Sequence, residues 1–137
     1  AAATQLRIVS ELKIAASIGK LPGKPKPKRA PFWRSELTTT TLAVNIGAVE
    51  RLLSSGIPEL VAKKAGNAQE SFKFELSQVK DELKTINSPW IDVVKSDQRH
   101  KVLSRLIDSL ARAIQIVQTS YFRALGLMLG FNSLDGD

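Results

Sequence analysis

The residues of this chain best suited to chemistry are basic side chains within one Pro-rich stretch, residues 20–34. This stretch contains four of the six prolines and six basic residues: Lys20, Lys24, Lys26, Lys28, Arg29 and Arg34. Alternation with proline stiffens the backbone and displays the charges outward. The first 34 residues carry a net charge of +7, whereas opposite charges cancel over residues 35–137. Local positive charge of this kind attracts an acidic partner.

An aromatic pair, Phe32 and Trp33, lies within the same stretch. Aromatic side chains beside a basic run can stack on bases, lie at a membrane interface or fill a pocket of another protein. In the alternative interpretation, the pair folds back onto the body of the protein as an anchor while the lysines stay solvated. We therefore predict a partner-binding site that comprises Lys20, Lys24, Lys26, Lys28, Arg29, Phe32, Trp33 and Arg34.

Groups that could support catalysis are scarce. The chain has no cysteine, and His100 is its single histidine. Two acids are adjacent only at Asp81-Glu82, and neighbouring helix positions point about 100° apart, so these carboxylates cannot converge. The sequence therefore predicts a protein that is not an enzyme, with no catalytic residues, no metal site and no cofactor.

Hydrophobic periodicity predicts that helices position the basic stretch. We expect helices over about 4–18, from 35 or 41 to 53, over 67–86, 90–95 and 97–128. Asn67 and Asp97 are the expected N-caps of the third and last long helices, and Gly19 is expected to end the first. Residues 20–34 should be extended or polyproline II, and not helical, because proline lacks the N–H donor and constrains the residue before it.

The third helix carries the clearest packing signal. Its apolar residues step by four, three, four and three: Phe72, Leu76, Val79, Leu83 and Ile86. This spacing favours packing between near-parallel helices. We predict an all-α four-helix bundle with an extended Pro-rich basic N-terminal segment. Its parts are an N-terminal helix (1–19), a basic arm (20–34) and a helical bundle (35–137).

The two ends of the chain bear on where it resides. The longest apolar run, Ala124 to Phe131, is eight residues long, against about 20 for a membrane helix, so no transmembrane segment is expected. The chain begins with three alanines and no Met. We expect either a processed mature form or a trimmed sequence, and favour the mature form, from which a targeting peptide has been removed.

Two short motifs in the middle of the chain resemble the extrinsic Q-type subunit of photosystem II (PsbQ) and its PsbQ-like relatives. They are Ile57-Pro58-Glu59-Leu60 and Phe72-Lys73-Phe74-Glu75-Leu76, and the similarity covers roughly residues 42–115. The resemblance implies a lumenal four-helix bundle whose basic arm docks on the acidic side of a thylakoid complex. It also implies an organellar location in the chloroplast thylakoid lumen.

These observations lead to one predicted function and one alternative. The prediction is a non-catalytic accessory subunit that stabilises a larger, photosynthetic complex by docking through the basic arm and a helical face on an acidic surface. The alternative is a nucleic-acid-binding helical protein that uses the same arm, with an affinity that falls steeply with salt. Against the alternative, the helices themselves carry no basic face.

Overall fold

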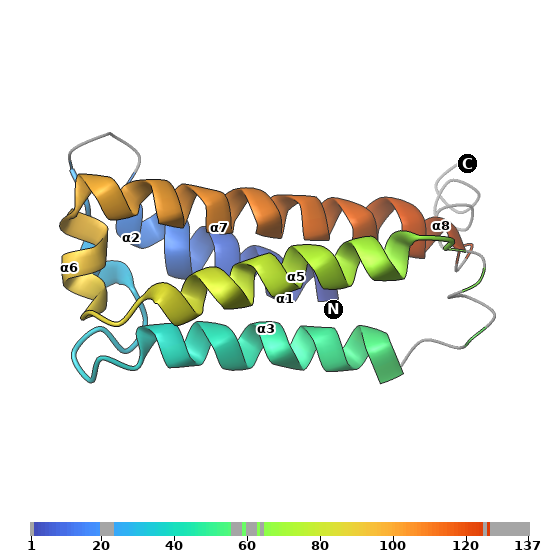
Figure 1. Cartoon of the computed structure of the whole chain (residues 1–137), viewed down its shortest axis with the longest axis horizontal. Helices are drawn as coiled ribbons and strands as arrows, with labels where there is room; N and C mark the ends of the chain where they lie inside the picture. The colour runs from blue at the N-terminus through green and yellow to red at the C-terminus, as the bar shows by residue number, and fades with distance from the viewer. Residues whose placement is uncertain are drawn as a thin grey trace, which may run out of the picture.

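Four long antiparallel helices form the protein in a computed structural model that describes residues 2–19, 24–55, 59, 63, 65–124 and 126. The first helix is continuous through three segments, α1 (Ala2–Arg7), η1 (Ile8–Ala15) and α2 (Ala16–Ile18). The second is α3 (Thr38–Ser55) and the third is α5 (Ala68–Thr85). The fourth runs through α7 (Asp97–Ile116), η3 (Val117–Tyr121) and α8 (Phe122–Ala124). Figure 1 shows that they alternate in direction.

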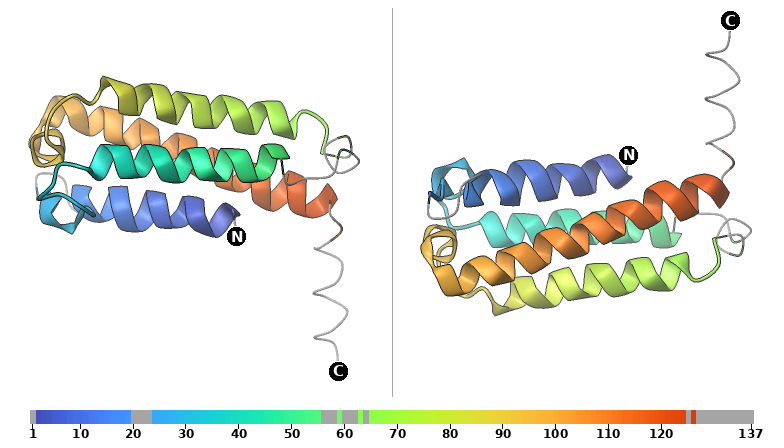
Figure 2. Two further views of the ribbon diagram at one scale, coloured as in Figure 1. Left: turned by 90° about the horizontal axis from the view of Figure 1, so that it is seen from below. Right: turned by 90° about the horizontal axis from the view of Figure 1, so that it is seen from above.

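Each long helix packs against two others. α5 contacts α3 and α7, and the first helix closes the bundle by contacting both α3 and α7 (Figure 2). Two short helices, η2 (Pro27–Arg29) and α6 (Trp90–Lys95), lie together at one end of the bundle. The described residues contain no strand. The predicted all-α four-helix bundle is confirmed.

Apolar stripes at helical spacing supply the core. On α5, Phe72, Leu76, Val79 and Leu83 are buried as the seam predicts, and Ile86 packs against them from the helix end. The other long helices contribute Leu6, Val9, Ile14, Leu42, Ile46, Leu103, Leu106 and Leu110, none of which is exposed. Burial of one such side chain contributes roughly 1.5–3 kcal/mol, so these stripes account for the fold.

The predicted helix boundaries agree with the structure more closely than the predicted capping interactions do. Gly19 ends the first helix, and α6 spans the six residues expected of it. Asn67 is the N-cap residue of α5 as predicted, but its side chain accepts no hydrogen bond from the helix start. Ser96, rather than Asp97, caps α7: its hydroxyl accepts a hydrogen bond from the Arg99 backbone N–H. The expected helix end near residue 128 lies outside the described residues.

Two of the long helices contain π-helical segments, η1 in the first and η3 in the last. A π-helical turn carries an extra residue and re-aims the side chains that follow it. Tyr121, the last residue of η3, lies inside the bundle, edge-on to the Phe72 ring at 6.3 Å between centroids. Among the described residues, none of the helices is both long enough and apolar enough to cross a bilayer.

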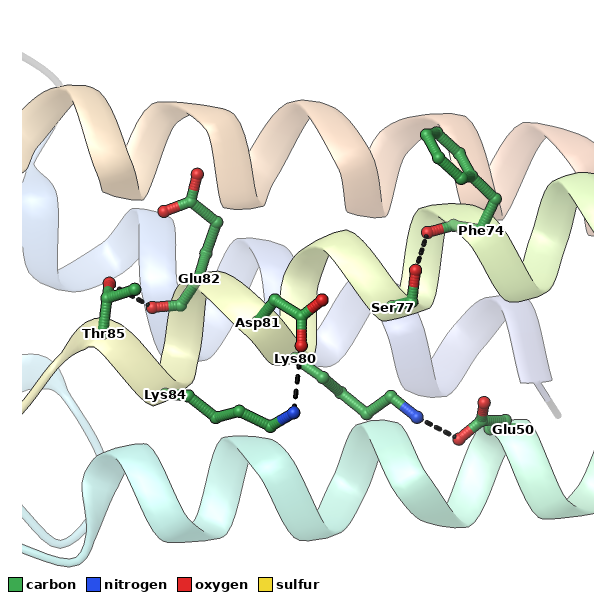
Figure 3. A network of polar contacts seen from close by, with 8 residues as sticks. All are labelled: Glu50, Phe74, Ser77, Lys80, Asp81, Glu82, Lys84 and Thr85. Atoms are coloured by element: carbon green, nitrogen blue, oxygen red, sulfur yellow. Dashed lines mark hydrogen bonds and ion pairs between the residues drawn. The ribbon is translucent and has the colours of Figure 1, made fainter.

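Ion pairs link the helices along their exposed edges. Lys80 of α5 pairs with Glu50 of α3 at 2.7 Å (Figure 3), and Arg105 of α7 pairs with Glu82 of α5 at the same distance. Arg112 donates from Nε to Glu75 Oε1 at 2.8 Å. Glu75 is the most enclosed of these acids, with 9% of its surface exposed, and no described group donates to its Oε2. The hydrogen bond from Arg112 to Glu75 raises the pKa of Arg112.

Replacing Arg112 by Met should therefore destabilise the bundle by about 1–2 kcal/mol, because the buried Glu75 carboxylate loses its partner. The loss is no larger because the Arg112 side chain is half-exposed and water screens the ion pair. Urea unfolding followed by circular dichroism measures the change. The matched control is Arg105→Met, whose partner Glu82 is more exposed, so the loss should be smaller. Equal losses in the two variants would contradict this account.

Tyr121 allows a pH-dependent prediction. Its hydroxyl is buried, no described group forms a hydrogen bond with it, and this burial raises its pKa above the ordinary value of about 10. The unfolded chain then loses the phenol proton before the folded one. Stability should consequently fall as the pH rises above about 10, since the native state holds the proton more tightly.

Tyr121→Phe should remove this dependence, and at neutral pH its stability should equal or exceed that of the wild type by up to about 1 kcal/mol. Because Tyr121 is the only tyrosine, the phenolate absorbance titrates this one group. An ordinary Tyr121 pKa in the folded protein, or identical alkaline unfolding of the wild type and the variant, would rule the explanation out.

Candidate functional site

The basic arm folds back across the end of the first helix. The Lys26 backbone N–H donates to the Ser17 carbonyl at 2.8 Å, which ties the arm to the last turn of that helix. Residues 27–29 form the single 3-10 turn η2, and turns follow up to Glu36. The expectation of a fully extended arm is therefore wrong over these residues. A 3-10 turn can begin at Pro27, because the first residue of a helical turn needs no N–H donor.

Two apolar residues anchor the arm. Pro27 and Ala30 are buried, and η2 contacts both α2 and α6. Farther along, the Thr38 hydroxyl donates to the Pro31 carbonyl at 2.7 Å and joins the arm to the start of α3. The arm is thus held at both sides of η2, and its basic side chains start from a fixed backbone.

The Trp90 side chain of α6 is hydrogen-bonded to the end of the first helix, where the arm begins. Its indole Nε1–H donates to the Ser17 hydroxyl at 3.1 Å, and that hydroxyl donates to the Ile14 carbonyl at 2.7 Å. Both Trp90 and Ser17 are buried. These hydrogen bonds give Trp90 a structural role, and Ser17 links α6 to the helix that carries the arm.

Gly19 permits the close approach of the arm. Its φ of 88° is a conformation that side chains disfavour, and a Cβ there would lie 2.5 Å from the Lys24 carbonyl oxygen. Gly19→Ala should therefore cost about 1–3 kcal/mol in the free energy of unfolding and displace the arm.

Gly66→Ala provides the matched control, because Gly66 also has a positive φ but nothing lies within 4 Å of its Cβ position. Its loss should be smaller, since only backbone strain is added. Denaturant unfolding of both variants tests this, and a Gly19→Ala variant no less stable than Gly66→Ala would show that the contact with Lys24 is unimportant.

The two aromatic residues of the arm have different environments. Trp33 is half-buried against the core, and its ring lies 5.7 Å from the Lys28 ammonium and 5.2 Å from the Arg34 guanidinium. Phe32 is 58% exposed and adopts a φ of 57°. The anchoring alternative therefore describes Trp33 but not Phe32. Cations already occupy the surroundings of the Trp33 ring, so it is poorly placed to stack on a base.

A cleft of about 610 Å³ opens between the arm and the first helix. Its lining residues are Glu11, Ala15, Ala16, Gly19, Lys24, Lys26 and Arg29. The structure thus brings together three of the predicted binding residues, Lys24, Lys26 and Arg29, and places Lys28 and Arg34 beside Trp33 instead. Lys20 lies outside the described residues. Sequence reasoning did not single out Glu11, because only the return of the arm brings it next to the lysines.

The remaining polar groups of the described residues do not form a metal centre. His100 is partly exposed in the first turn of α7. No group of three or more His, Cys, Asp or Glu side chains that could hold a metal ion occurs in the part of the chain that the structure describes. Among the cavities of the described residues, the basic cleft is the one lined by several cations.

The fold and the cleft define a helical bundle with a basic cleft at one end. Residues 1–117 match the model of the imelysin family, peptidase M75. Since this match spans well over half of the sequence, the chain belongs to the imelysin family. Comparison with curated proteins and with solved structures finds no match.

The family match overturns the resemblance to PsbQ, because it includes all of residues 42–115, on which that resemblance depended. The structure gives the reason. In the motif Phe72-Lys73-Phe74-Glu75-Leu76, the buried residues Phe72 and Leu76 belong to the α5 seam, and Lys73 and Phe74 face outward. Any amphipathic helix of a bundle produces such a pattern.

The functional predictions that followed from that resemblance are wrong as well. The chain is not an accessory subunit of photosystem II, and the PsbQ-like and chloroplast interpretations fall with the same finding. The family match also gives no support to the nucleic-acid-binding alternative. The family's description carries the word peptidase. The family match therefore does not confirm the prediction that the protein is not an enzyme.

Proposed function

We propose that this chain is an imelysin-type module that serves iron uptake, and that it acts by binding a ligand rather than by hydrolysing peptides. Membership of the imelysin family supports the connection with iron uptake. The observation that carries the choice of binding over hydrolysis is the distribution of charge. The glutamates that link neighbouring helices of the bundle are engaged with basic partners, whereas cations gather at the cleft.

Three carboxylates show this engagement. Glu50, Glu75 and Glu82 each accept a hydrogen bond from a basic side chain of a neighbouring helix, at 2.7 or 2.8 Å. A general base or a metal ligand needs a carboxylate free to meet the substrate or the ion. These three acids instead join helices, so their geometry supports a structural role.

The proposal predicts two results for the protein. Loss of the gene in the source organism should lower the accumulation of radiolabelled iron in iron-poor medium, and the intact gene should restore it. The purified protein should release no fragments from a peptide library analysed by mass spectrometry. Unchanged iron accumulation would refute the role in uptake.

Peptide hydrolysis requires its own control, because a contaminating protease would give a false positive. The Arg112→Met and Arg105→Met variants, prepared in the same way, should match the wild type in the peptide assay. Fragments that appear with the wild type and disappear in a variant of the bundle would show that the protein itself is a peptidase and would overturn the proposed mode of action.

A further inference from the structure

We propose that the cleft between the first helix and the arm binds a small hydroxycarboxylate anion, through Lys24, Lys26 and Arg29 to its carboxylates and Glu11 to its hydroxyl. This inference deepens the proposed function and, where it names an iron chelate, rests on it. Hydroxycarboxylates such as citrate hold ferric iron as soluble anionic complexes. An uptake protein could therefore recognise the metal through the charge of its chelator.

The first step in the argument is that the cationic side chains start from fixed positions. The hydrogen bond between Lys26 and Ser17, the close approach at Gly19 and the burial of Pro27 hold the backbone on both sides of the cleft. A preorganised site loses less entropy on binding than a mobile chain does.

The second step concerns charge. Lys24, Lys26 and Arg29 are exposed, and none of the ion pairs found among the described residues involves them. Ammonium and guanidinium groups form their strongest hydrogen bonds with carboxylate or phosphate oxygens. Three cations in one cleft therefore suit an anion with more than one carboxylate.

Glu11 narrows the choice of anion. As the one acid among the seven lining residues, it repels a ligand that presents only carboxylate oxygens. A carboxylate accepts hydrogen bonds, so a ligand hydroxyl directed at Glu11 turns this repulsion into a favourable contact. The lining therefore favours a polycarboxylate that also carries a hydroxyl group.

The size of the cleft agrees with a small ligand. Its volume of about 610 Å³ lies within the range of small-molecule sites, roughly 300–1,000 Å³. A purely structural role for the cations is the competing explanation, because basic side chains near the end of a helix stabilise its C-terminal carbonyl groups. Binding measurements separate the two.

The test is isothermal titration calorimetry of citrate with the folded protein at about 0.15 M ionic strength. Lys24→Gln/Lys26→Gln/Arg29→Gln should weaken binding by at least about tenfold, since three charge-assisted contacts are lost. The matched control is Lys73→Gln/Lys95→Gln/Lys101→Gln, which removes the same charge from exposed positions on three helices and should change the affinity less than about twofold.

Tricarballylate, which is citrate without its hydroxyl, tests the role of Glu11. The wild type should prefer citrate, because its hydroxyl can donate to the Glu11 carboxylate. Glu11→Gln should reduce that preference, since a neutral amide oxygen accepts a weaker hydrogen bond than a carboxylate does. Equal affinities of the wild type for the two anions would overturn the assignment of Glu11. No binding of citrate by the wild type, or equal binding by both triple variants, would overturn the cleft as an anion site.

The same variants distinguish this inference from the proposed function. If the cleft variant loses citrate binding in calorimetry while loss of the gene leaves iron accumulation unchanged, the cleft is supported and the role in iron uptake is refuted. If loss of the gene lowers iron accumulation and the cleft variant restores it fully, the role in uptake is supported and the cleft, as the site for the iron chelate, is refuted.

Discussion

Burial of the first helix among the other three is the constraint on which the rest of this structure depends. Leu6, Val9 and Ile14 are fully enclosed, and the helix contacts both α3 and α7, so it closes the fourth side of the bundle. The same helix carries Ser17 and Gly19, which receive the returning arm. A shift of this helix would therefore disturb the core and the cleft together.

The charges of the protein fall into two groups with different physical roles. In the bundle, acids and bases of neighbouring helices pair across the surface and help to fix which helix faces are adjacent. The more exposed pairs contribute little stability, whereas the enclosed Glu75 depends on its partner Arg112. In the arm, cations outnumber acids, and the fold gathers part of them around one cleft.

Much of the fold could be predicted from the sequence, because helix periodicity and helix-ending residues are local signals. The α5 seam, the end of the first helix at Gly19 and the short helix Trp90–Lys95 all appear as expected. Less of the candidate site could be predicted. The division of the arm between a cleft and the surroundings of Trp33 depends on how the arm folds back onto α2 and on its contact with α6, which is distant in sequence.

The PsbQ resemblance failed for a related reason. Its motifs recorded a pattern of buried and exposed positions that many helical bundles share, so it carried information about helix packing and not about ancestry. The sequence by itself determined the four-helix architecture and the concentration of positive charge in the first quarter, since both follow from residue types and their local spacing. Only the tertiary structure decided that Glu11 joins Lys24, Lys26 and Arg29 in one cleft, because the chain must reverse at Gly19 and dock Pro27 before these residues meet.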